Sequence, residues 1–151
     1  MSGDPLAAAV GRLIGRPWSR RFTCWHLVAE VLALRGLVLP VPARIPADPQ
    51  RRHDAFTAHP ERRRWRRMEA LAPWAVVLMS RCPAPRRDEH AGVVVALPMP
   101  LVLHVMAPQG TILEEPSRLA AQGWFLDFYL PLEGPAAPRA SRAALPAPAQ
   151  T

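Results

Sequence analysis

Five short apolar segments, separated by proline or glycine turns, fill the second half of this chain and constrain its fold most. They are residues 75–79, 91–97, 101–106, 110–114 and 125–130. Each has the length of a strand rather than of a helix, and the second is rich in valine. Pro-Met-Pro at 98–100 and Ala-Pro-Gln-Gly at 107–110 are typical turn sequences. The pattern predicts an antiparallel meander, with one helical turn at 117–122 before the last strand.

The first half of the chain shows helical spacing instead. Residues 5–15 predict a short helix, which Pro17 prevents from continuing. Thr23 is suited to cap a second helix and Gly36 to end it. Between 40 and 60, five prolines predict a loop, and the arginine-rich stretch 62–68 is a candidate helix without an apolar stripe. The second helix is the clearest because its apolar residues recur three and four apart: Leu27, Val28, Val31, Leu32 and Leu34.

Helices followed by strands predict an α+β fold, in which N-terminal helices pack on an antiparallel sheet of about five strands. A chain of 151 residues has room for one sizeable core. We expect that domain to span residues 1–133. Residues 134–151 are rich in proline and alanine and are predicted to be disordered.

The charge of the chain favours anionic partners. The net charge is +7, and every one of the 19 Lys+Arg residues is an arginine. Nucleic acid, anionic lipid and acidic cell-wall polymers all remain open on charge alone. We do not expect nucleic acid, because no recognition fold or interleaved aromatic platform accompanies the charge. The arginine runs at 62–67 and 86–87 are interpreted as a solvated basic face rather than as phosphate or carboxylate sites.

Targeting and metal-binding signals are weak. The N-terminus has no early basic residue and no long apolar run, so no signal peptide is expected. No segment approaches the ~20 apolar residues of a membrane span. We therefore expect a cytoplasmic or virion-associated protein. Two cysteines without a CxxC pair predict neither a disulfide framework nor a metal site, although a single disulfide between Cys24 and Cys82 stays open, and no cofactor is expected.

Cys24 lies at the first turn of the predicted second helix. Unpaired backbone N–H groups and the positive end of the helix dipole meet there. Both favour a thiolate, which is the nucleophilic form of cysteine. The alternative is a buried cysteine with no chemical role. Cys82, in a Pro/Arg loop, is assigned none.

Two histidines are suited to act with that sulfur. His90 opens the valine-rich strand, and Gly92 beside it allows a neighbouring element to approach closely. His104 interrupts the next strand and would lie near His90 if residues 98–100 form a hairpin turn. His90 would then be the general base and His104 the residue that orients it. A solvated loop histidine and a carbonyl-bound histidine are the alternatives.

The remaining histidines are not assigned to catalysis. His26, two residues beyond Cys24 on the predicted helix, points to a different side and is a poor base, but it would border the cleft. His53 and His59 fall in the proline-rich segment and receive no role.

Three stretches together resemble the NlpC family of cysteine peptidases, particularly its bacteriophage tail branch. They are Thr-Cys-Trp-His-Leu-Val at 23–28, His-Ala-Gly-Val-Val-Val at 90–95 and Val-Leu-His at 102–104. In that family a helix-start cysteine is the nucleophile, a histidine in His-Val-Gly is the base, and a polar residue on the next strand orients it. Flanking stretches extend the likeness over roughly residues 10–131.

The resemblance implies a papain-like NlpC fold and a thiol amide hydrolase. Cys24 would be the nucleophile, His90 the base and His104 the orienting residue. It also implies a peptidoglycan stem peptide as substrate, a phage or prophage tail as the setting, and other tail proteins as partners. The backbone N–H of Cys24 would help to stabilise the oxyanion.

The chain also departs from the family pattern. Thr23 stands where the family has aspartate, His26 and Trp74 where it has glycine, and Ala91 where it has valine. A non-catalytic tail-assembly or tail-tip component with the same fold is therefore the second hypothesis. A basic nucleic-acid-binding module, which rests on charge alone, is the third.

Overall fold

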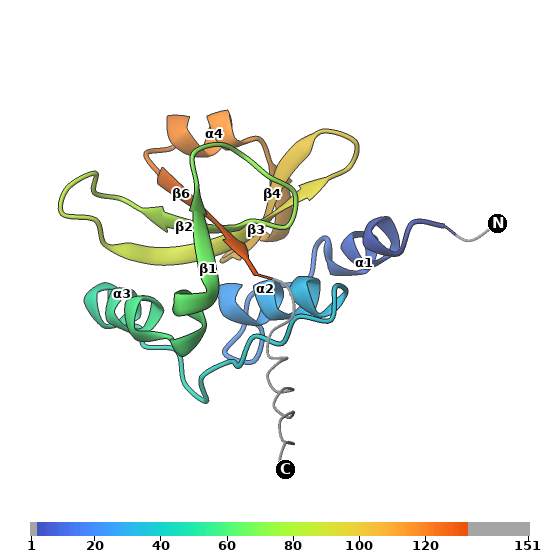
Figure 1. The fold of residues 1–151 in the computed structure, drawn as a ribbon. Coiled ribbons are helices and arrows are strands. Elements are labelled where there is room, and N and C mark those ends of the chain that lie inside the picture. The colour runs from blue at the N-terminus through green and yellow to red at the C-terminus, as the bar shows by residue number, and fades with distance from the viewer. Residues whose placement is uncertain (1–2, 133–151) are drawn as a thin grey trace, which may run out of the picture.

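A six-stranded antiparallel sheet forms the centre of the molecule in the computed structural model, which describes residues 3–132 (Figure 1). The strand order is β1-β6-β2-β3-β4-β5. Strands β2 to β5 form the predicted meander, whereas β6 returns across the sheet to pair with β2. The strands are β1 (Trp65–Met68), β2 (Val76–Ser80), β3 (Asp88–Ala96), β4 (Pro100–Met106), β5 (Gly110–Glu114) and β6 (Phe125–Pro131).

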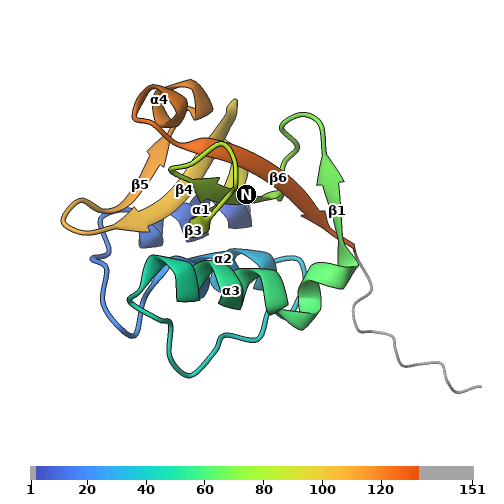
Figure 2. The same cartoon turned by 90° about the vertical axis from the view of Figure 1, so that its left-hand side faces the viewer.

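Helices cover both faces of the sheet. Figure 2 shows α2 and α3 on one face and the short α4 on the other. The helices are α1 (Pro5–Leu13), α2 (Cys24–Ala33), α3 (Pro49–Ala58), the 3-10 helix η1 (Pro60–Arg64) and α4 (Pro116–Ala121). The predicted α+β class, with N-terminal helices packed on an antiparallel sheet, is confirmed.

Two apolar cores lie on opposite faces because side chains alternate along each strand. Val76 and Leu78 of β2 belong to the core beneath α2, which we call the helix-side core. Val77 and Met79 belong to a smaller core that includes Leu119 of α4, which we call the α4-side core. Every residue of β2 is buried. The site described below lies near the start of β3, with contacts to both cores.

Two segments differ from the sequence prediction. Residues 49–58, expected as loop, form α3, because Asp48 caps the helix by accepting a hydrogen bond from the Arg51 N–H and Pro49 occupies its first position. The stretch 62–68, a candidate helix, becomes the end of η1 followed by β1, which pairs with β6. This accounts for the sixth strand. The predicted tail, 134–151, lies outside the described residues.

Candidate active site

Helix α2 starts at Cys24 because the side chain of His26 closes the turn before it. Nδ1 of His26 accepts a hydrogen bond from the Thr23 backbone N–H at 3.1 Å and lies 2.9 Å from the Thr23 hydroxyl oxygen. A glutamate or glutamine usually makes this reciprocal contact at the third helical position. His26 is therefore a capping residue that fixes where the helix begins, a role that sequence reasoning missed.

The Cys24 thiol is buried, with a side chain that belongs to the helix-side core. Burial raises the pKa of the thiol to about 11, because a thiolate is poorly solvated there. A hydrogen bond from the Ala91 backbone, the charge of Arg52 and the N–H groups at the start of α2 act in the opposite direction but are outweighed. The helix start does favour a thiolate, as predicted, yet in the resting protein the group is a neutral thiol.

His90 and His104 are brought together as the sequence predicted. They lie on the adjacent strands β3 and β4, and His90 Nε2 is 3.0 Å from His104 Nδ1. The His90 ring also contacts the ring of Trp124, with centroids 5.6 Å apart. Burial lowers the pKa of His90 to about 3, and the neighbouring charges of His104, Arg52 and Arg81 add to that effect. His90 is therefore neutral at ordinary pH.

Glu114, at the end of β5, continues the chain of contacts. Its Oε1 lies 2.9 Å from His104 Nε2, and its Oε2 accepts a hydrogen bond from Gln122 Nε2 at 2.8 Å. His104 is fully buried, and burial lowers its pKa although the Glu114 carboxylate acts to raise it. Sequence reasoning missed Glu114. A signal existed, since His104 pairs with Ile112 and Glu114 lies two residues further on, on the same face of the hairpin.

Gly92 makes room for the second imidazole. A Cβ atom at this position would lie 2.8 Å from the Leu103 carbonyl oxygen and 3.1 Å from His104 Cβ. The first distance is one that real Cβ atoms essentially never show, and the second is tighter than most real Cβ contacts. Strands β3 and β4 therefore approach closely at Gly92, which supports the prediction made for this glycine.

Cys24 and His90 reach the same cavity from different sides of β3. Both line a cavity of about 930 Å³. The sulfur packs beside Ala91, the residue after His90, in the helix-side core, whereas the His90 ring contacts Trp124 of the α4-side core. Within residues 3–132, no hydrogen bond joins Cys24 to His90, and none is made by His90 Nδ1. That nitrogen is the open end of the histidine pair.

The cavity wall is rich in arginine. Arg52 stabilises the cavity wall by donating hydrogen bonds to the backbone carbonyls of Glu89, Pro46 and Ala47. In the described chain, three further guanidinium groups on the wall make no ion pair or hydrogen bond. Free guanidinium groups bind carboxylates in a bidentate fork, so the cavity is suited to an anionic ligand. These three arginines are Arg20, Arg44 and Arg51.

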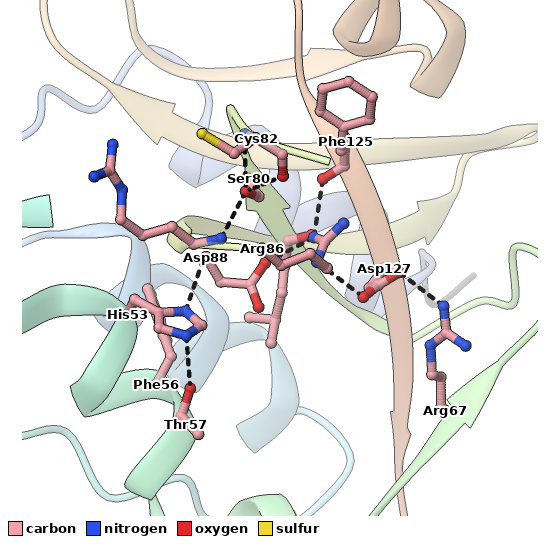
Figure 3. A network of polar contacts seen from close by, with 12 residues as sticks. His53, Phe56, Thr57, Arg67, Ser80, Cys82, Arg86, Asp88, Phe125 and Asp127 are labelled. Carbon is pink, nitrogen blue, oxygen red and sulfur yellow. Dashed lines mark hydrogen bonds and ion pairs between the residues drawn. The ribbon is translucent and has the colours of Figure 1, made fainter. Parts of the chain in front are cut away.

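Arg86 is not part of a solvated basic face, contrary to the prediction for residues 86–87. Its guanidinium contacts the carboxylates of Asp88 at 2.7 Å and Asp127 at 3.1 Å, and it donates to the carbonyls of Leu78 and Phe125 (Figure 3). We call this set the Arg86 network. It ties β2, β3 and β6 together at one end of the sheet.

The residues to which the sequence assigned no role are His53, His59 and Cys82, and the structure shows their surroundings. His53 accepts a hydrogen bond from the Asp88 backbone N–H through Nδ1, as Figure 3 shows. His59 is buried against Trp25 and its Nε2 lies 2.8 Å from the Pro40 carbonyl oxygen. Cys82 is a free cysteine, so it forms no disulfide with Cys24.

Comparisons with known proteins add no family assignment. No protein-family model matches the chain, and no curated protein is significantly similar to it. Among residues 3–132, no helix is both long and apolar enough to cross a membrane. The same residues contain no cluster of three or more His, Cys, Asp or Glu side chains arranged to hold a metal ion.

Proposed function

We propose that this protein is a cysteine-type amide hydrolase that cleaves peptidoglycan stem peptides as part of a phage or prophage tail. The observation that carries the proposal is the contact between His90 and His104 at the wall of a cavity that also contains Cys24. A helix-start sulfur, a buried imidazole and a second imidazole that orients it are the parts of a nucleophile–base–orienter triad.

The local geometry indicates a neutral resting pair rather than an ion pair. The thiol with a raised pKa and the imidazole with a lowered pKa both favour their uncharged forms. Cys24 and His90 are not joined by a hydrogen bond in the described part of the chain, so the proposal requires the thiol proton to reach His90 Nδ1 across the shared cavity as the sulfur bonds to the substrate carbonyl carbon. The imidazolium would then protonate the departing amine. Water, activated by the same imidazole, would hydrolyse the thioester and return the thiol.

The position of Trp74 adds to the resemblance. Trp74 has a φ of +73° just before β2, which places it in the left-handed region that glycine prefers. The NlpC family has glycine at the matching place in its Pro-Gly-Asp stretch. A backbone conformation suited to glycine at this place therefore supports the proposal, although the residue differs.

The arginines of the cavity wall suit the proposed substrate. Stem peptides carry free carboxylates, and Arg20, Arg44 and Arg51 present guanidinium groups that no described residue pairs. A neutral peptide would provide no anionic partner for these guanidinium groups.

The proposal is tested by digestion of purified peptidoglycan. We expect the full chain to release muropeptides with new amino and carboxyl ends, detected by mass spectrometry. Cys24→Ser should abolish this release, and Cys82→Ser, the matched control on the other free cysteine, should not. Intact peptides after prolonged digestion by the wild-type chain would refute the hydrolase.

A non-catalytic tail component with the same fold is the second candidate. The burial of the Cys24 thiol and the absence of a hydrogen bond from it to His90 favour this alternative. It predicts that Cys24→Ser binds tail proteins and supports tail assembly as the wild type does.

A further inference from the structure

We infer that Glu114 is a positioning residue that sets the proton positions on both imidazoles and so leaves His90 Nδ1 as the nitrogen able to accept a proton. The inference deepens the proposed function and rests on it for its catalytic meaning. The proton positions themselves can be tested without any substrate.

The carboxylate of Glu114 imposes the first constraint on the proton positions. Glu114 is ionised, because hydrogen bonds from Gln122 and His104 and the charges of His104 and Arg118 lower its pKa despite partial burial. An ionised carboxylate can only accept hydrogen bonds. Since Oε1 lies 2.9 Å from His104 Nε2, that nitrogen must carry a proton. Two lone pairs would otherwise face each other at this distance.

The proton position on His104 in turn determines the proton position on His90. A neutral imidazole has one N–H and one lone pair, so His104 Nδ1 is an acceptor once Nε2 holds the proton. His90 Nε2 lies 3.0 Å from it and must therefore donate. The neutral His90 ring then has its lone pair on Nδ1. This is the nitrogen for which residues 3–132 provide no hydrogen-bond partner.

The surroundings hold this arrangement in place. Gln122, which binds Glu114, is itself fixed through its carbonyl, which accepts a hydrogen bond from Arg81 Nη1 at 2.6 Å. The same Arg81 lies 3.7 Å over the ring of Trp124, which in turn packs on His90. The turn between α4 and β6 thus covers the histidine pair on the side away from Cys24.

The test is a long-range proton–nitrogen NMR spectrum of the full chain, labelled with ¹⁵N-histidine, at neutral pH. Protonated and unprotonated ring nitrogens are well separated in such spectra. We expect Nε2–H on both His90 and His104. Nδ1–H on His90, or a doubly protonated His104, would overturn the inference. Because this measurement uses the wild-type protein, it decides the matter even if a variant does not fold.

Variants add a functional readout. Glu114→Ala should give mixed proton positions on His90 and lower kcat by about 10- to 100-fold with little change in KM, less than the ~10⁴-fold cost of a wrong tautomer in a serine triad. Glu114→Gln should restore most of the rate, because an amide oxygen still accepts from His104. Glu115→Ala removes an equal charge from the exposed neighbour, whose side chain caps nothing, and should change neither readout.

The outcomes separate this inference from the proposed function. If the proton positions are as assigned but no peptide is hydrolysed, the proposed hydrolase is refuted. The role of Glu114 in setting the proton positions then still stands. If peptides are hydrolysed but His90 is protonated at Nδ1, the inference about Glu114 is refuted and the proposed hydrolase is not. A fall in kcat for Glu115→Ala equal to that for Glu114→Ala would also contradict it, because the effect would then be one of charge.

Discussion

Two buried polar networks lie on the same sheet, and they differ in how they end. In the Arg86 network the guanidinium is surrounded by two carboxylates and two backbone carbonyls. The chain of contacts from Glu114 through His104 to His90 is anchored at the carboxylate but ends at a ring nitrogen that has no partner among residues 3–132. The Arg86 network pairs its buried charged groups, whereas the open ring nitrogen of His90 is the feature on which the proposed chemistry depends.

Loss of the open-ended imidazole should produce the largest effect. His90→Gln removes the proposed base while the fold retains its packing, so the rate of muropeptide release should fall by about 10²- to 10⁴-fold. Initial rates measured by liquid chromatography check this. His53→Gln is the control, because within the described part of the chain His53 makes hydrogen bonds to Asp88 and Thr57 alone and does not line the cavity. Similar rates for the two variants would remove His90 from the chemistry.

Breaking the Arg86 network should instead reduce stability. Arg86→Met leaves the buried carboxylate of Asp88 uncompensated, at a cost of about 3–5 kcal/mol in the free energy of unfolding. Denaturant titration measures this value. Arg67→Met removes an arginine whose side chain is 59% exposed, and it should change stability far less. Equal losses of stability would mean that the Arg86 network does not hold β2, β3 and β6 together as described.

Filling the space at Gly92 should have an intermediate effect. Gly92→Ala places a methyl group against Leu103 and His104, so we expect a loss of about 1–3 kcal/mol in stability, with a fall in activity as His104 shifts. Gly11→Ala is the matched control, since a Cβ there meets nothing within 4 Å and α1 should gain stability. A stable, fully active Gly92→Ala would contradict the close strand approach.

Acid should reveal the neutral state of His90. Its pKa is about 3 in the folded protein and near 6.5 when the chain is unfolded, so between these values only the unfolded state binds the proton. The free energy of unfolding should therefore fall as pH is lowered, by up to about 1.4 kcal/mol per pH unit from this residue. Arg52, Arg81 and His104 face the ring and favour its neutral form. His90→Gln should show a flatter pH dependence, and an unchanged slope would mean that the ring is already protonated.

The sequence predicted the parts of the structure in which local pattern and tertiary packing agree. The helix start at Cys24 and the meander carrying His90 and His104 follow from capping residues and apolar strands. The segment α3 was missed because its prolines suggested a loop, although Pro49 only begins the helix. Strand β1 was missed because its charged residues become a strand only through pairing with β6.

The state of the site depends on three-dimensional burial, which the pattern of residues does not show. A cysteine at a helix start predicts a lowered pKa, but the helix-side core around Cys24 reverses the direction. Glu114 needed the register of the β4–β5 hairpin before its contact with His104 became visible.

The most direct test of the central claim, that Cys24 forms a covalent acyl intermediate, is digestion of muropeptides in the presence of hydroxylamine. This nucleophile intercepts a thioester and leaves a hydroxamate on the released peptide, which mass spectrometry identifies. We predict that the wild-type chain yields the hydroxamate and that Cys24→Ser yields none. Cleavage that gives only free acids at saturating hydroxylamine, or no cleavage at all, would contradict the account.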